Sequence, residues 1–91
     1  MLIKNWAVGM RNEGEYSLPS ACLTGAVYSH PSYEDGYVIS TSPIVKIRKV
    51  GNIAIVTTRS GSIYFITAEG VNPDYEKSYP YAFDRLPVTE A

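Results

Sequence analysis

A short polar run, Thr57 to Ser62, contains the first residues whose types could do chemistry. Gly61 and the serines beside it favour a turn that exposes backbone N–H groups and hydroxyls. Arg59 adds a planar, permanently charged group that matches the geometry of phosphate oxygens. Two interpretations stay open, a hairpin tip that holds a phosphate and an ordinary solvated turn. The second is the commoner use of polar turns.

A second run, His30 to Tyr37, combines hydrogen-bonding groups with two aromatic rings. Tyr33 and Tyr37 have the ring type that stacks on bases in nucleotide sites. The hydroxyls of Thr41 and Ser42 follow shortly after this run. The alternative is an ordered loop with a turn at its end, in which the tyrosines cover the edge of the core. Both interpretations remain open at this stage.

The sequence offers little for catalysis. His30 is the one histidine and Cys22 the one cysteine, which excludes a cysteine-based zinc site and a disulfide within these residues. The chain has no nucleophile elbow, P-loop or dinucleotide-binding glycine motif. Cys22 sits in an apolar strand pattern, where a thiol is generally a packing group. We therefore expect a protein that is not an enzyme and uses no metal or cofactor.

Aromatic residues also gather near the end of the sequence. Tyr75, Tyr79 and Phe83 recur four residues apart, with Tyr81 and Arg85 beside them. On a continuous helix the first three would form one stripe, able to cover a face of a sheet. Such a composition is also typical of interface hot spots. We expect this part to support a homo-oligomer, a dimer or larger.

The elements that must position these residues are predicted to be strands. Apolar and β-branched residues mostly recur at strand spacing. Pro43 is expected to interrupt the pattern, Gly51-Asn52 to form a hairpin turn and Gly25 to suit a bulge. The pattern predicts a mainly β protein, an antiparallel sheet of about six strands that can close into a barrel. The expected strands span residues 2–10, 21–29, 37–41, 44–50, 53–58 and 63–67.

The pattern changes after residue 70. Asn72 suits a helix N-cap, Pro73 the first helical position, and Asp74 the positive end of the helix dipole. We expect one domain over residues 1–91, with a β part at 1–70 and one or two short helices and a tail at 71–91. Trp6 and Ile55 are expected in the core.

Composition removes several classes of function. The 91 residues are 45% hydrophobic and 19% charged, a balance typical of a folded domain. The net charge of −1 disfavours duplex nucleic acid as a partner, because non-specific affinity for DNA comes from Lys and Arg on phosphates. No apolar run is long enough to span a membrane, and the first residues become polar too early for a signal peptide. The expected location is the cytoplasm, with no membrane partner.

Three motifs together resemble a known group of small proteins. They are His30-Pro31-x-Tyr33-x-Asp35-Gly36-x-x-Ile39-x-Thr41-Ser42-x-Ile44, Thr58-x-Ser60-Gly61-Ser62-x-Tyr64 and Asn72-Pro73-Asp74-Tyr75-Glu76. The sequence resembles small bacteriophage and prophage proteins, and within that group the Thoeris anti-defence sponge proteins. The resemblance implies an antiparallel β fold that binds a cyclic nucleotide immune signal, such as glycocyclic ADP-ribose, at subunit contacts without cleaving it. The implied location is the cytoplasm of the host cell.

Rings for adenine, guanidinium groups for phosphate and hydroxyls for ribose are the groups such a ligand needs. The candidate ligand-binding residues, chosen by this chemistry, are Tyr28, Tyr33, Tyr37, Thr41, Ser42, Arg59, Ser60, Ser62 and Arg85. An alternative function is a phage inhibitor or accessory protein that binds a host defence complex. The candidates for mimicking nucleic-acid charge in that case are Glu13, Glu15, Glu34 and Asp35. A phage structural protein is a third option.

Overall fold

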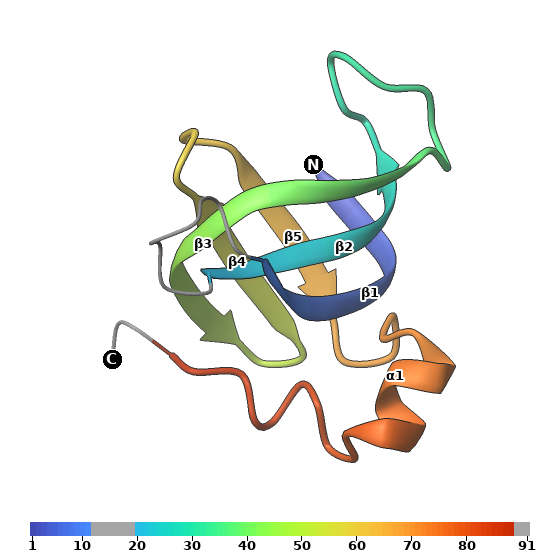
Figure 1. Ribbon diagram of the computed structural model, residues 1–91, viewed down its shortest axis with the longest axis vertical. Coiled ribbons are helices and arrows are strands. Elements are labelled where there is room, and N and C mark those ends of the chain that lie inside the picture. The colour runs from blue at the N-terminus through green and yellow to red at the C-terminus, as the bar shows by residue number, and fades with distance from the viewer. Residues whose placement is uncertain (12–19, 89–91) are drawn as a thin grey trace.

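Five strands, each paired with the next along the chain, close into a barrel (Figure 1). The computed structural model describes residues 1–11 and 20–88. The strands are β1 (Leu2–Arg11), β2 (Ser20–Tyr28), β3 (Val38–Val50), β4 (Ile53–Thr58) and β5 (Ile63–Thr67), followed by the helix α1 (Pro73–Ser78). The prediction of a mainly β protein with a short C-terminal helix is therefore confirmed. Glu13 and Glu15, two of the candidates for mimicking nucleic-acid charge, lie outside the described residues.

The barrel closes between β1 and β5, and this pair is parallel while the others are antiparallel. Strand direction alternates along a meander, so its first and fifth strands must run the same way. The Phe65 N–H donates to the Met1 carbonyl at 2.7 Å. Past the end of β5, the Trp6 N–H donates to the Gly70 carbonyl at 3.1 Å. These bonds satisfy the edges that an open sheet would expose.

The predicted break at Pro43 is wrong, because β3 runs through it as one strand. Pro43 pairs with Cys22 of β2, and its carbonyl accepts from the Arg59 N–H at 2.8 Å. The β2–β3 register shifts next to Cys22, and the β3–β4 register shifts between Ile44 and Lys46. Pro43, which has no N–H to donate, therefore lies where the pairing of β3 with β2 ends and its pairing with β4 begins. Two expected strands thus become one.

Gly25 allows β1 and β2 to approach closely at a sharp bend of β1. A Cβ atom at Gly25 would lie 2.5 Å from Ile3 Cγ2 and 2.7 Å from the Lys4 carbonyl oxygen. The β1–β2 register shifts between Lys4 and Ala7, directly across from this glycine. The predicted bulge therefore exists, with the extra residues on β1 rather than on β2.

The core fills the barrel with inward-facing side chains from every strand. Trp6 is fully buried, and its Nε1–H donates to the Thr67 carbonyl at 2.7 Å. Its expected place in the core is confirmed. The expectation for Ile55 is wrong, since the alternation of β4 turns Ala54 and Val56 inward and leaves Ile55 half-buried on the outer wall.

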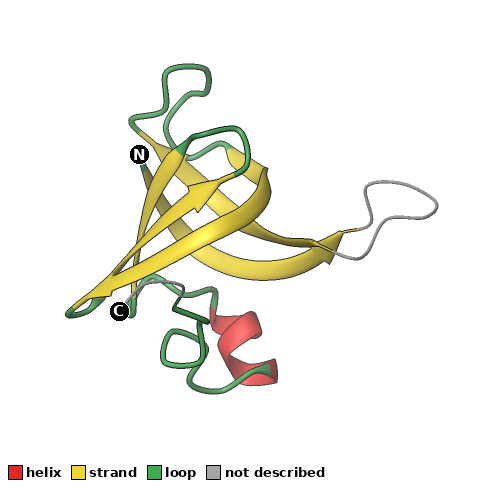
Figure 2. Ribbon diagram, turned by 90° about the vertical axis from the view of Figure 1, so that its left-hand side faces the viewer, coloured by secondary structure: helices red, strands yellow, loops and turns green. Residues whose placement is uncertain are grey.

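The helix α1 and the segment after it cover one end of the barrel (Figures 1 and 2). Asn72 caps the helix as predicted, its side chain accepting from the N–H groups of Asp74 and Tyr75 at 2.9 and 3.2 Å. Phe83 then packs against Trp6 with ring centroids 6.5 Å apart. Within the described part of the chain, no helix is long and apolar enough to cross a membrane.

Candidate functional site

The loop of residues 29–37 and the turn of residues 59–62 lie at the barrel end opposite α1 (Figure 1). We call this end the loop end. The loop joins β2 to β3 and the turn joins β4 to β5, so the meander brings two distant parts of the sequence to one rim. The two polar runs that the sequence analysis singled out are these two segments.

Four aromatic side chains form a cluster at the loop end. Tyr33 and Tyr37 stack with centroids 5.3 Å apart and planes 11° apart. The centroid of the His30 ring lies 4.7 Å from that of Tyr33 and 6.2 Å from that of Tyr64. Tyr64 is buried inside the barrel at this end. We call His30, Tyr33, Tyr37 and Tyr64 the aromatic cluster. It links the exposed loop to the core through one imidazole ring.

Hydrogen bonds hold the loop in this shape. The Ser32 N–H donates to His30 Nδ1 at 2.9 Å, and His30 Nε2 faces the Tyr64 hydroxyl at 3.5 Å. The Ser29 N–H donates to Asp35 Oδ1 at 2.9 Å. Gly36 takes a φ of 88°, and its N–H donates to the Val27 carbonyl at 2.7 Å. The turn predicted at Asp35-Gly36 is confirmed, and only glycine adopts its backbone conformation without strain.

A cluster of hydroxyls occupies the turn side of the loop end. Ser60 Oγ lies 3.1 Å from Ser42 Oγ, 3.2 Å from Thr58 Oγ1 and 3.4 Å from Ser62 Oγ. The Ser60 N–H also donates to Ser42 Oγ at 3.2 Å. We call Ser42, Thr58, Ser60 and Ser62 the hydroxyl cluster. Arg59 is exposed and lies in the sequence between Thr58 and Ser60 of this cluster.

The remaining predicted site residues belong to neither cluster. Thr41 is buried, and its hydroxyl accepts from the Leu23 N–H at 3.0 Å and donates to the Ser42 carbonyl at 2.8 Å. This hydroxyl therefore bonds to the backbone of β2 and β3 within the barrel wall. Tyr28 is half-buried at the end of β2, with Lys4 Nζ 4.9 Å above its ring. Arg85 follows α1 and lies at the opposite end of the barrel.

The C-terminal aromatic residues do not form the expected stripe. The helix ends at Ser78, so Phe83 lies beyond it and is buried, while Tyr79 and Tyr81 are exposed. Tyr75 is half-buried beside Trp6, with ring centroids 6.3 Å apart. Burial raises the pKa of Tyr75; a hydrogen bond with the Val8 backbone partly offsets this, and the nearby Tyr79 adds to the rise. The rings of Tyr75 and Phe83 close the barrel end around Trp6.

The sequence analysis placed Thr58 in a polar run and Tyr64 in a motif, but it did not choose either as a ligand-binding residue. Both face inward by strand alternation, and that alternation was the available signal. Their partners, His30 for Tyr64 and Ser60 for Thr58, come from segments joined only by the fold. Over residues 1–11 and 20–88, no group of three or more His, Cys, Asp or Glu side chains is placed to hold a metal ion.

An apolar cavity of about 130 Å³ lies away from the loop end. It is bounded by β1, β2, β3 and the segment after α1, and its lining is Val8, Ala21, Ile44, Val45, Ile47, Leu86 and Pro87. No residue of the aromatic cluster or of the hydroxyl cluster is part of this lining. A ligand at the loop end would therefore bind to an exposed rim rather than inside this cavity.

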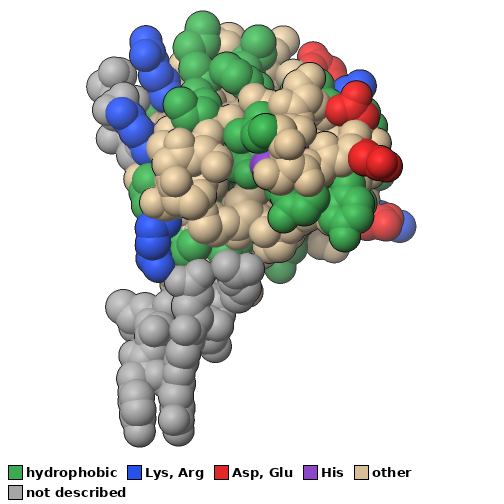
Figure 3. All heavy atoms as spheres, turned by 90° about the horizontal axis from the view of Figure 1, so that it is seen from above, with side chains coloured by type: hydrophobic (Ala, Val, Ile, Leu, Met, Phe, Trp, Pro, Cys, Tyr) green, Lys and Arg blue, Asp and Glu red, His purple; other side chains and the backbone are tan. Residues whose placement is uncertain are grey.

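Charge is unevenly distributed around the loop end. Figure 3 looks onto this end and shows a group of Lys and Arg side chains on one side, and the Asp and Glu side chains on the other, with Lys or Arg among them. Glu34 and Asp35 are exposed in the loop, on the side of the aromatic cluster. Arg59 lies in the turn, on the side of the hydroxyl cluster. The turn side is therefore the better place for an anion.

Comparison with protein-family models, with curated proteins and with solved structures found no match. The resemblance to anti-defence sponge proteins therefore stays a prediction from the sequence motifs.

Proposed function

We propose that this chain is a non-catalytic binding domain that holds a small phosphorylated ligand with an aromatic base at the loop end. A cyclic nucleotide immune signal, the ligand class implied by the sponge resemblance, has this chemistry. The observation that supports the proposal is that the aromatic cluster and the hydroxyl cluster lie at the same end of the barrel (Figure 1). Tyr64 and Thr58 are buried at this end, whereas Tyr33, Tyr37 and Ser60 are exposed and are not needed to close the core.

The tyrosine pair supplies the base contact. Tyr33 and Tyr37 are 43% and 58% exposed, so their stack leaves ring surface open to solvent. Stacking of a base on an aromatic ring contributes about 1–3 kcal/mol. The packing of His30 against Tyr33 fixes the ring pair in advance, which reduces the ordering cost of binding.

The turn supplies the phosphate contacts. Ser60 and Ser62 offer hydroxyl donors, and Arg59 brings a guanidinium group that can donate two parallel hydrogen bonds to phosphate oxygens. Each hydrogen bond to a charged phosphate contributes about 1.5–3 kcal/mol. The carboxylates of Glu34 and Asp35 repel a phosphate from the loop side. We therefore orient the base toward the tyrosines and the phosphates toward the turn.

The engagement of His30 supports binding rather than cleavage. Its Nδ1 accepts from the Ser32 N–H, and its Nε2 faces the Tyr64 hydroxyl. Both nitrogens of the one imidazole thus hold the loop in place. A general base needs a nitrogen free to reach the ligand.

The test is direct binding with recovery of the ligand. The protein is incubated with candidate cyclic nucleotides, freed of excess, heat-denatured, and the released material is identified by mass spectrometry. We expect an intact ligand, and affinity at least about tenfold weaker in Tyr37→Ala and Ser60→Ala because each removes a direct contact. Tyr81→Ala, an exposed tyrosine at the opposite end, is the matched control.

Two results would overturn the proposal. One is the failure of every candidate to bind at micromolar protein. The other is recovery of a cleaved product, which would indicate an enzyme.

A further inference from the structure

The outer wall formed by β3, β4 and β5 carries a contiguous group of apolar side chains bordered by an arginine. Its residues are Arg48, Val50, Ile53, Ile55, Ile63 and Phe65, which we call the outer β3–β5 face. Val50 pairs with Ile53, and Arg48, Ile55 and Phe65 form one row across the three strands. Ile63 follows on the same side of β5. Side chains in such rows lie next to one another, so these residues form one surface.

This surface is open to solvent. Val50 is 55% exposed, Ile63 47%, Ile53 44% and Phe65 41%. Single exposed apolar residues are ordinary, whereas a contiguous group marks an interaction site. The centre row also has the composition of interface cores, with an arginine, a branched aliphatic residue and an aromatic ring side by side.

The charge of the barrel wall has one sign. None of the strands that the structure describes contains Asp or Glu, whereas β3 places Lys46 and Arg48 on its exposed side. Lys49 points to the other side of β3, where its Nζ donates to the Asp84 carbonyl at 3.2 Å and lies 5.1 Å from the centroid of the Phe83 ring. The described acidic residues lie in loops, in α1 and in the segment after it. In Figure 3, Lys and Arg side chains border hydrophobic ones on the side of the molecule facing away from most Asp and Glu. A partner for this face therefore needs negative charge next to apolar groups.

We propose that the outer β3–β5 face is a docking surface for a partner protein whose contacting segment carries Asp or Glu beside apolar side chains. Phe65 and Ile55 supply the apolar anchor, and Arg48 supplies a guanidinium group that binds a carboxylate through two hydrogen bonds. This inference goes beyond the ligand site and does not rest on it.

The observations favour this partner over three others. A second copy laid face to face would bring positive charges together without a carboxylate from the strands to offset them. Single-stranded nucleic acid is held by several stacking rings, and Phe65 is the one aromatic residue on this face. A partner strand cannot add to β4, which is paired on both sides.

The experiment titrates the isotope-labelled full chain with two synthetic amphipathic helical peptides, observed by NMR. The peptides share an apolar face of leucines and differ in the flanking residues, glutamate in one and lysine in the other. We expect the glutamate peptide to shift amide signals of β3, β4 and β5 and to bind at least about tenfold tighter than the lysine peptide. Signals of the loop 29–37 should stay in place.

Single substitutions test the arginine and the apolar anchor of this face separately. Arg48→Glu should reverse the preference between the peptides, whereas Lys77→Glu on α1, with the same charge change, should preserve it. Phe65→Ser should weaken binding of the glutamate peptide at least about tenfold, whereas Tyr79→Ser, another exposed aromatic residue, should not. Should Phe65→Ser fail to fold, Ile63→Ser replaces it.

Four outcomes would overturn the inference: no shift on this face with either peptide, equal binding of both peptides, binding unaffected by Arg48→Glu, or shifts at another surface. Concentration-dependent shifts of this face without peptide would instead assign it to a second copy. Shifts of this face with oligothymidylate or with phosphatidylglycerol vesicles, but not with the glutamate peptide, would assign it to a nucleic acid or a membrane. A failed search for a cyclic nucleotide leaves each of these results unchanged.

Discussion

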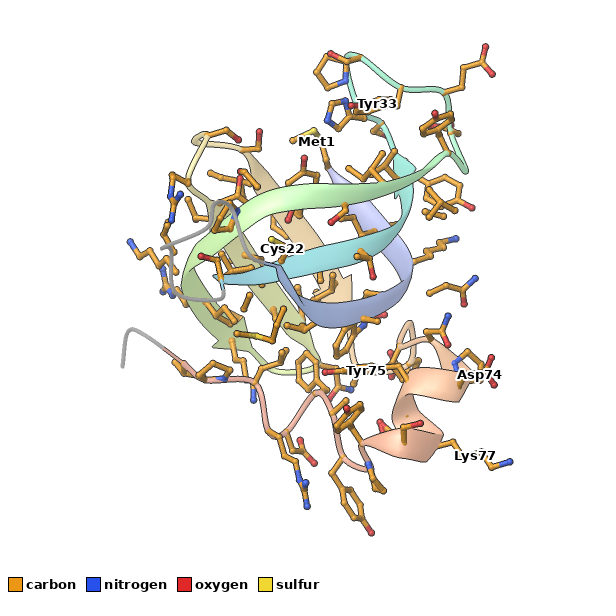
Figure 4. The ribbon with its side chains drawn as sticks, in the orientation of Figure 1. Met1, Cys22, Tyr33, Asp74, Tyr75 and Lys77 are labelled. Atoms are coloured by element: carbon orange, nitrogen blue, oxygen red, sulfur yellow. The ribbon has the colours of Figure 1, made fainter. Side chains whose placement is uncertain are left out.

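The two ends of this barrel use aromatic residues in opposite ways. At the α1 end, Tyr75 and Phe83 pack around the fully buried Trp6. At the loop end, Tyr33 and Tyr37 stack on each other and remain largely exposed. Figure 4 labels Tyr33 and Tyr75 and shows them at these opposite ends. A high tyrosine content thus serves two purposes, burial at one end and presentation at the other.

The difference follows from what lies beneath each set of rings. At the α1 end, the rings cover apolar side chains of the core, so their burial stabilises the fold. At the loop end, Tyr64 already fills the barrel mouth and His30 lies against it. The exposed tyrosines therefore contribute little to the core. We expect substitutions at the α1 end to change stability and those at the loop end to change binding.

The largest expected effect is at Trp6. Trp6→Ala should lower the free energy of unfolding by about 3–5 kcal/mol, because it leaves a cavity where Tyr75 and Phe83 meet the barrel. Urea denaturation measures the change. Ile55→Ala, on the outer wall, is the comparison and should cost less than half as much. Equal losses of unfolding free energy in the two variants would show that the α1 end does not dominate stability.

The second expected effect concerns the attachment of the segment after α1. The Glu76 carboxylate accepts from the N–H groups of Tyr81 and Ala82 at 2.5 and 3.1 Å. Glu76→Ala should cost about 1–3 kcal/mol of local stability, because two backbone donors lose a charged acceptor. Hydrogen exchange at those two amides should accelerate. Glu69→Ala, an exposed acidic residue in the loop before α1, should leave their exchange unchanged.

Local sequence signals predicted the parts of this fold that depend on near neighbours. Asn72 and Pro73 specify the start of α1 by themselves, and the alternation over 53–58 and 63–67 specifies two strands. The break predicted at Pro43 was wrong because a strand accommodates this proline only where its pairing changes from β2 to β4, and a local sequence pattern does not show that change. The candidate site depended even more on the fold. His30 meets Tyr64 across 34 residues and Ser42 meets Ser60 across 18, so residue types were predictable and their grouping was not.

The third prediction addresses the loop end. His30→Ala removes the acceptor of the Ser32 N–H and the ring beneath Tyr33, so the loop should lose its fixed shape. We expect a stability change under about 1 kcal/mol, since the bond with Ser32 is exposed and the one with Tyr64 is long and only partly buried. Near-ultraviolet circular dichroism should nevertheless lose tyrosine signal, and nucleotide affinity should fall if the proposed site is correct. A large loss of stability would mean that this end also supports the core.

The smallest expected effect is the loss of stability at the α1 end in alkaline solution. Burial favours the neutral phenol of Tyr75 and raises its pKa in the folded chain above the unfolded value. The corresponding stabilisation is fully present below the unfolded pKa of about 10 and is lost as the pH rises through the folded pKa. Urea midpoints at about pH 8 and about pH 11 measure this loss.

Two phenylalanine variants isolate the contribution of the Tyr75 hydroxyl. Tyr75→Phe cannot ionise, so its midpoint should fall less between the two pH values than that of the unaltered protein. Tyr81→Phe, at an exposed position of the same segment, should behave like the unaltered protein. Identical alkaline losses in both variants would show that Tyr75 is no better shielded than an exposed tyrosine. The contrast between the two barrel ends would then rest on Trp6 and Phe83 alone.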